Sequence, residues 1–172
     1  MNSKKDEAKP SKLKNNFLVA IRLRGTVGLR PKIEYTLQSL RLLKRYNAVI
    51  LRNEPEVIGM VRIVKDFITW GEINKENMES MLRKRGKVDG NKKLTDEFVK
   101  EKLGPSSIKD LSNDLWNSKI TFKKLMEAGL KPVFHLRPPK GGFKKSIKRP
   151  FKGEGELGYR GGDINKLLAK MA

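Results

Sequence analysis

Apolar and polar residues alternate strictly in the first patterned stretch of the chain. From position 17 to 24 every second residue is apolar, and the intervening positions end in two arginines, Arg22 and Arg24. A period of two residues is typical of a β-strand with one face in the core and one face toward solvent. We therefore predict a half-buried strand whose outer face ends in the two arginines.

A short glycine turn, residues 25–28, follows this strand and leads into a helix. Pro31 suits the first position of a helix, where the missing N–H is not needed. Apolar residues then recur three or four positions apart and form one stripe: Ile33, Leu37, Leu40 and Leu43. The pattern predicts a helix from Pro31 to about Leu43 or Lys44.

Two more strands and one more helix complete the first unit. Residues 48–51 are apolar on both faces, a new helix begins near Pro55, and residues 67–73 form a third strand. Residues 17–73 thus read as strand, helix, strand, helix, strand. Such crossovers make parallel neighbours by default, although loops this short leave an antiparallel arrangement open.

Residues 74–130 have the pattern of four short helices separated by clear stops. Each helix is preceded by a residue that favours the N-cap position: Asn74, Thr95, Ser107 and Thr121. Short helices with sparse apolar stripes bury little surface alone. We expect them to form a helical extension packed on the first unit.

The two ends of the chain differ in character. Residues 1–16 are polar and rich in lysine, which predicts a flexible basic arm. Residues 131–172 form a basic tail rich in glycine, proline and aromatic residues, with a closing helix after Asp163. Its candidate RNA-binding residues are Arg137, Lys140, Phe143, Lys144, Lys145, Lys148, Arg149, Lys152 and Arg160. Either the tail orders on RNA or it is a disordered, solubilising extension.

The charge balance indicates a polyanionic partner. The 172 residues include 39 Lys and Arg against 19 Asp and Glu, a net charge of +20 that repels itself in the compact state. Nucleic acid is the default partner, because the apolar runs are too short to span a membrane. The absence of cysteine excludes disulfides and cysteine-ligated zinc and, with no apolar segment after Lys5, fits a cytoplasmic protein.

Four cations surround the first turn, and we call them the loop cluster: Arg22, Arg24, Arg30 and Lys32. They are either ordinary solvated surface or a phosphate site. Cations at a helix N-terminus are unfavourable in the free protein by a few tenths of a kcal/mol each. A bound phosphate makes the placement of these cations favourable, and we therefore favour phosphate contact over solvated surface.

Neither a nucleotide site nor a catalytic site is indicated. Residues 25–28 lack the glycine spacings of nucleotide-binding loops. His135 has no motif partner for acid–base work. The paired carboxylates, Glu54 with Glu56 and Glu154 with Glu156, lie in cap and linker settings. We expect no catalytic residue, metal, cofactor or small-molecule substrate.

Several segments together resemble a known family, the universal large-subunit ribosomal protein thirty, called L-thirty in bacteria and L-seven in eukaryotes. They are VAIRLRGTVGLRP (19–31), LQSLRL (37–42), NAVIL (47–51) and VIGMVRIVKD (57–66). The bacterial form is similar to residues 17–73 alone. The middle helices and the segments PPKGGF (138–143) and GELGYRG (155–161) resemble the longer archaeal-type form.

The resemblance implies an α+β fold related to ferredoxin-like folds, with a three-stranded antiparallel sheet and both helices of the first unit on one face. This replaces the default of parallel crossovers. It also implies a structural role on large-subunit rRNA, near the 5S rRNA, beside neighbouring ribosomal proteins. rRNA contacts would fall first on the loop cluster.

The sequence therefore predicts a non-enzymatic, rRNA-binding constituent of the cytoplasmic ribosome that neutralises phosphates and recognises RNA shape. Two alternatives use the same basic surface. One is an RNA-processing or modifying enzyme, which needs a metal or an acid–base cluster with perturbed pKa values. The other is a free RNA chaperone, which would bind duplex DNA about as well as folded rRNA.

Overall fold

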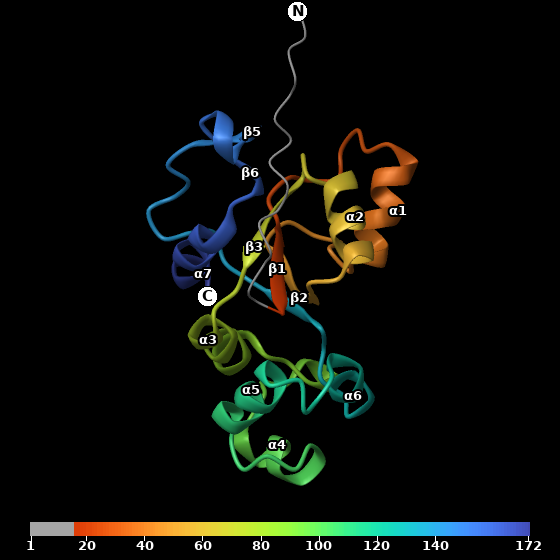
Figure 1. The fold of residues 1–172 in the computed structure, drawn as a ribbon, viewed down its shortest axis with the longest axis vertical. Coiled ribbons are helices and arrows are strands. Elements are labelled where there is room, and N and C mark those ends of the chain that lie inside the picture. Colours follow the sequence, from red (N-terminus) through yellow and green to blue (C-terminus); the bar gives the residue numbers. More distant parts are fainter. Residues whose placement is uncertain (1–15) are drawn as a thin grey trace, which may run out of the picture.

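A computed structural model describes residues 16–172, so the predicted arm lies outside the described residues except for Asn16 (Figure 1). The strands are β1 (Phe17–Arg22), β2 (Asn47–Arg52), β3 (Ile68–Glu72), β4 (Val133–His135), β5 (Ser146–Pro150) and β6 (Gly155–Tyr159). The helices are α1 (Pro31–Ser39), α2 (Pro55–Ile63), α3 (Lys75–Arg85), α4 (Asp96–Lys102), α5 (Ile108–Trp116), α6 (Phe122–Glu127) and α7 (Ile164–Met171).

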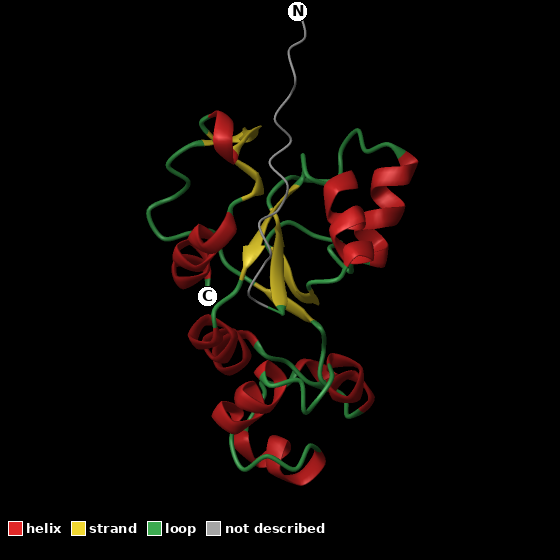
Figure 2. Ribbon diagram, viewed as in Figure 1, coloured by secondary structure: helices red, strands yellow, loops and turns green. Residues whose placement is uncertain are grey.

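The sheet is larger than the resemblance implied. Six strands pair in the order β4-β2-β1-β3-β6-β5, so the expected three-stranded antiparallel sheet is wrong as a description of the whole (Figure 2). The three strands of the first unit do lie together, with β1 antiparallel to both β2 and β3. The tail strand β6 then joins β3 in parallel, which makes the sheet mixed.

The default of parallel crossovers fails because α1 does not carry the chain back to the start of β1. Residues 40–46 return instead to the end of the sheet where β1 stops, and the Tyr46 N–H donates to the Arg22 carbonyl at 2.7 Å. β2 therefore runs opposite to β1, with Ile21 paired to Ala48.

Helices cover both faces of the sheet. α1 and α2 lie side by side on one face and pack against Leu18, Ala20 and Val49. α3 to α7 contribute to a second apolar cluster on the other face, together with Phe17 and Val19. All six residues of β1 are buried, so the prediction of a half-buried strand was wrong. Alternation could not reveal this, because the helices that cover the second face come from residues 74–171.

Helix α1 ends at Ser39, four or five residues before the predicted limit. Arg41 adopts a positive φ of 61°, its N–H donates to the Gln38 carbonyl, and the Leu42 N–H donates to the Leu37 carbonyl. These two bonds form a Schellman motif, which usually has glycine at the position held here by Arg41. The sequence therefore carried no stop signal, and Leu43, expected in the apolar stripe, is exposed.

Three of the four predicted N-caps in the helical extension are made by side chains. Asn74 accepts from the Asn77 N–H, Thr95 from the Phe98 N–H, and Ser107 from the Asp110 N–H. Thr121 occupies the N-cap position of α6 without a side-chain bond. These helices share the apolar cluster on the second face with the sheet and with α7.

The tail folds onto the edge of the first unit. The aromatic ring of Tyr159 lies 4.7 Å from that of Trp70, and its hydroxyl donates to Glu72 at 2.6 Å. A β-carbon on Gly71 would lie 2.1 Å from the Gly161 carbonyl oxygen, so only glycine permits this approach of tail and β3. Tyr159, one of the aromatic residues of the tail, is thus engaged within the protein.

Candidate nucleic-acid interface

Arg22, the first member of the loop cluster, points into the protein. It is 2% exposed, and its guanidinium donates to the carbonyl oxygens of Arg24, Leu42, Leu43 and Gly25 at 2.7 to 3.0 Å. Burial lowers its pKa, and the charge of Glu34 partly offsets this. Arg22 ties the end of β1 to the turns on either side, so its donors are occupied by the fold.

The other members of the loop cluster lie at the surface. Arg24 is half-buried, with its guanidinium 5.0 Å from the centre of the Phe67 ring. Arg30 is the N-cap residue of α1, makes no side-chain cap bond and is exposed, as is Lys32. Two exposed cations thus lie at the positive end of a helix that has no side-chain cap and has Glu34 as the acid of its first turn.

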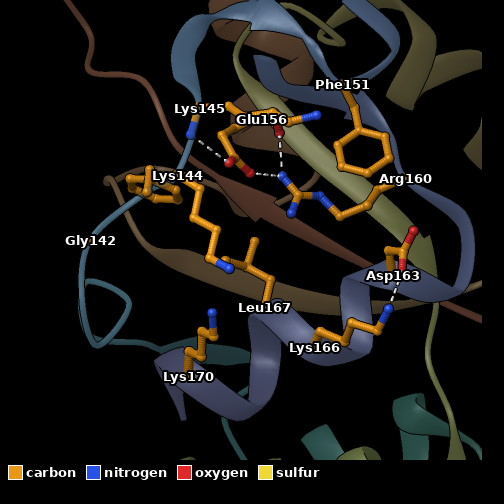
Figure 3. Close-up of a pocket in the computed structure, with 11 residues that line it drawn as sticks. Gly142, Lys144, Lys145, Phe151, Glu156, Arg160, Asp163, Lys166, Leu167 and Lys170 are labelled. Carbon is orange, nitrogen blue, oxygen red and sulfur yellow. Dashed lines mark hydrogen bonds and ion pairs between the residues drawn. The ribbon is translucent and has the colours of Figure 1, made fainter. Parts of the chain in front are cut away.

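The tail and α7 enclose a second basic feature, which we call the tail hollow. It has a volume of about 310 Å³ and is shown in Figure 3. Its walls come from three segments of the tail, and five of its residues are cations against two carboxylates. The lining residues are Gly142, Phe143, Lys144, Lys145, Phe151, Glu156, Arg160, Asp163, Lys166, Leu167 and Lys170.

A buried ion pair forms one wall of the tail hollow. Arg160 donates to both the carboxylate and the carbonyl of Glu156, and the backbone N–H of Lys145 donates to the same carboxylate. The ring of Phe151 lies 4.7 Å from the Arg160 guanidinium and 5.5 Å from the Lys145 ammonium. The carboxylate of Glu156 is therefore neutralised by Arg160 and does not pair with the exposed lysines of the tail hollow.

The remaining carboxylate is also paired. Lys166 donates to Asp163 at 2.9 Å, and this hydrogen bond holds the pKa of Asp163 below its usual value. Lys144 and Lys170 are exposed, and neither makes an ion pair with any residue in the described part of the chain. The Lys145 ammonium, which lies over the Phe151 ring, makes no ion pair with a described residue either, so the tail hollow has an excess of positive charge carried by three lysines.

The structure brings together some of the predicted tail residues and leaves others apart. Phe143, Lys144, Lys145 and Arg160 all line the tail hollow, and Phe143 also packs on the core. The remainder are exposed and do not line it: Arg137, Lys140, Lys148, Arg149 and Lys152. None of the loop cluster lines it either, so the candidate contacts form at least two separate surfaces.

Four charged residues of the tail hollow were not among the candidates from the sequence: Glu156, Asp163, Lys166 and Lys170. Lys166 and Lys170 lie one helical turn apart on α7, and this spacing of two lysines on one helix was a usable signal. Glu156 was interpreted as linker chemistry, yet it is buried as the partner of Arg160. Nothing in the sequence places those two side chains together.

His135 lies on β4, at the edge of the sheet. Its Nδ1 lies 2.8 Å from the Asn47 side-chain oxygen on β2, and burial, followed by the charge of Lys87, lowers its pKa. Within residues 16–172, no group of three or more His, Asp or Glu side chains could hold a metal ion. No helix of the described segment is long and apolar enough to cross a membrane.

Comparison with known proteins gives consistent matches. A profile of the family described as "Ribosomal protein L30p/L7e" matches residues 18–68. "Large ribosomal subunit protein uL30" of Aeropyrum pernix is 49% identical over 152 residues, covering 88% of this chain and 96% of the relative. The protein of the same name from Archaeoglobus fulgidus is 46% identical over 155 residues, covering 90% of this chain and 99% of the relative.

Proposed function

This chain belongs to the ribosomal protein L30p/L7e family, and on that premise we propose that it binds rRNA through phosphate contacts at the loop cluster and the tail hollow. As a family member it is a structural protein of the large ribosomal subunit and not an enzyme. Its partners are rRNA and ribosomal proteins, and the proposal concerns which of its residues meet the RNA.

The unpaired lysines of the tail hollow carry the proposal. Lys144 and Lys170 repel each other and their neighbours in the free protein, and phosphate oxygens would remove that repulsion. The buried pair of Glu156 and Arg160 fixes the wall behind them, so the cations are held at one place on the surface. A fixed cluster of cations selects the path of an RNA backbone more than its sequence.

The loop cluster supports the proposal in a second way. Arg30 and Lys32 stand at the N-terminus of α1, where the helix dipole favours an anion and disfavours cations. Their placement is unfavourable for the free protein and favourable next to a phosphate. Arg22 stays outside the proposed contact surface, because its guanidinium donates inward.

Of the alternatives, the enzyme is excluded by family membership, and the free RNA chaperone makes a different prediction about nucleic-acid preference. A protein whose cations are fixed to match folded rRNA binds that RNA more tightly than duplex DNA of equal length. A chaperone that relies on net charge alone would bind both about equally. Competition of duplex DNA against large-subunit rRNA separates these functions.

Salt dependence tests the proposed contacts. The variant Lys144→Gln/Lys170→Gln should bind large-subunit rRNA more weakly, with a slope of log affinity against log salt smaller by roughly 1.4 to 1.8. The control Lys100→Gln/Lys109→Gln removes the same charge from the exposed surfaces of α4 and α5. Equal slopes in the two variants would show that only net charge matters and would contradict the proposal.

A further inference from the structure

Four basic side chains gather at the β4 edge of the sheet, opposite to the edge where β5 and β6 lie. We call them the β4-edge patch: Lys44, Lys87, Lys131 and His135. They come from four different segments of the chain: the turn before β2, the residues after α3, the residues before β4, and β4 itself. No sequence motif links them, and the tertiary fold alone brings them together.

Backbone contacts hold these segments side by side. The Lys131 N–H donates to the Lys87 carbonyl at 2.8 Å, beside a bridge between Val88 and Leu130. His135 is the partner of Asn47 across β4 and β2, and the side chains of this pair lie 2.8 Å apart. Backbone pairing therefore fixes the patch both between residues 87–88 and 130–131 and between β4 and β2.

The charges of the patch are not balanced by carboxylates. None of the three lysines makes an ion pair with a residue that the structure describes, and the Lys131 ammonium donates instead to the neutral Asn91 side chain at 2.7 Å. Burial is the largest cause that lowers the His135 pKa. The positive charges of Lys87, Lys44 and Lys131 lower it further. The patch is thus an uncompensated positive surface in the free protein.

The position of the patch separates it from the part of the tail hollow that β6 and residues 142–145 line. β4 forms one edge of the six-stranded sheet, and β5 forms the other, next to the β6 residues that line the tail hollow. Five strand spacings correspond to about 24 Å along the sheet. Lys87 and Lys144 are therefore too far apart to contact the same phosphate group.

We propose that the β4-edge patch binds the phosphates of a second RNA segment, so that the protein joins two RNA segments across the width of its sheet. This rests on the proposed function, because it takes the tail hollow to hold the first segment. An RNA backbone suits the patch because its cations are spread over several segments and need repeated negative charges. An acidic protein segment is the competing occupant, and the test includes it.

Directed cleavage of RNA tests the proposal. The chain contains no cysteine, so a single introduced thiol gives one attachment point for a chelated iron that releases hydroxyl radicals. Lys93→Cys places the iron beside Lys87, with which Lys93 forms a bridge, and Ser146→Cys places it beside the tail hollow. Lys100→Cys on α4 is the control. Each full-length variant is bound to large-subunit rRNA before cleavage is started.

Two separate sets of cleaved nucleotides, one for each position, are expected. Cleavage from Ser146→Cys without cleavage from Lys93→Cys would overturn the second contact, favour a protein occupant and leave the proposed function standing. The same nucleotides cleaved from both positions would overturn the joining of two segments. Absence of cleavage from both would count against the proposed function itself. RNA cleavage from Lys100→Cys equal to that from Lys93→Cys would indicate that RNA binds the protein surface without specificity, and this would also overturn the proposal.

Charge removal provides a second, independent readout. Lys44→Gln/Lys87→Gln should lower the salt slope of rRNA binding by roughly 1.4 to 1.8 and abolish the cleavage made from Lys93→Cys. Cleavage made from Ser146→Cys should persist in the same background. A slope equal to that of the Lys100→Gln/Lys109→Gln control would contradict the second contact.

Discussion

Arg160 and Glu156 pair with each other inside the wall of the tail hollow, where both side chains are only 7% exposed. Arg160 also donates to Thr69 on β3 at 3.2 Å, so the pair connects the tail to the first unit. A buried charge is tolerated when it is both paired and hydrogen-bonded. The pair therefore fixes the tail on the sheet and leaves the exposed lysines free for a ligand.

Removal of the acid should destabilise the protein. Glu156→Gln leaves the Arg160 charge buried without a counter-charge, and we expect a loss of about 1.5 to 3 kcal/mol in the free energy of unfolding. Glu154→Gln removes the same charge from an exposed neighbour and should change stability little. Urea unfolding measures both. Equal losses in the two variants would mean that the pair contributes nothing specific.

Substitutions of Arg22 and Lys32 should have different effects, the first on stability and the second on rRNA binding. Arg22→Met keeps the apolar volume but leaves the carbonyls of Leu42 and Leu43 without their donor, so we expect a loss of at least about 2 kcal/mol. Lys32→Met should leave stability nearly unchanged and weaken rRNA binding. Urea unfolding and rRNA affinity at low temperature measure the two effects. An Arg22→Met protein of normal stability would refute the structural role.

The N-cap of α1 offers a substitution with opposite effects on stability and binding. Arg30→Ser supplies a side-chain oxygen that can accept from a backbone N–H of the first turn, and it should stabilise the protein by about 0.5 to 1 kcal/mol. It should also weaken rRNA binding, because one cation is lost. Thermal unfolding and filter binding measure these changes.

The matched control is Glu54→Ser at the N-cap of α2, which likewise precedes a proline and makes no side-chain cap bond. It should stabilise less, since a favourable acid is removed from the helix N-terminus. Its rRNA affinity should not fall. A similar loss of affinity in both variants would show that Arg30 makes no contact of its own.

Two glycines test how closely the tail approaches β3. Gly71→Ala forces apart the β3 and Gly161 backbones, so we expect a loss of about 1 to 3 kcal/mol and faster hydrogen exchange at the Arg160 N–H, which donates to Trp70. Gly59→Ala in α2 meets open space and should stabilise by about 0.5 to 1 kcal/mol. A Gly71→Ala protein with unchanged exchange would contradict this tail packing.

His135 should make stability depend on pH. Its pKa in the folded protein lies below the ordinary 6.5 because of burial and the charges of Lys87, Lys44 and Lys131. The unfolded chain therefore binds a proton that the folded chain resists, so stability is complete above pH 6.5 and falls as the pH drops below it. Melting temperatures at pH 7.5 and 5.5 test this, and His135→Gln should reduce the difference. An equal difference in the variant would assign the effect to other groups.

Local patterns predicted most of the elements. Alternation marked β1, apolar stripes marked the helices, and Asn74, Thr95 and Ser107 form the expected caps. These features depend on residues a few positions apart, which a sequence displays directly. The end of α1 was not predicted, because Arg41 adopts a positive φ, a conformation that glycine usually signals in a sequence.

The sequence by itself determined the family, the basic character and the order of the elements. Only the tertiary structure decided that β1 is buried on both faces, that Arg22 donates inward, and that Glu156 meets Arg160. It also decided that Lys44, Lys87 and Lys131 gather at one edge. Each of these depends on segments far apart in the chain that meet only when the core closes, and no local pattern of charge or hydrophobicity encodes which segments will meet.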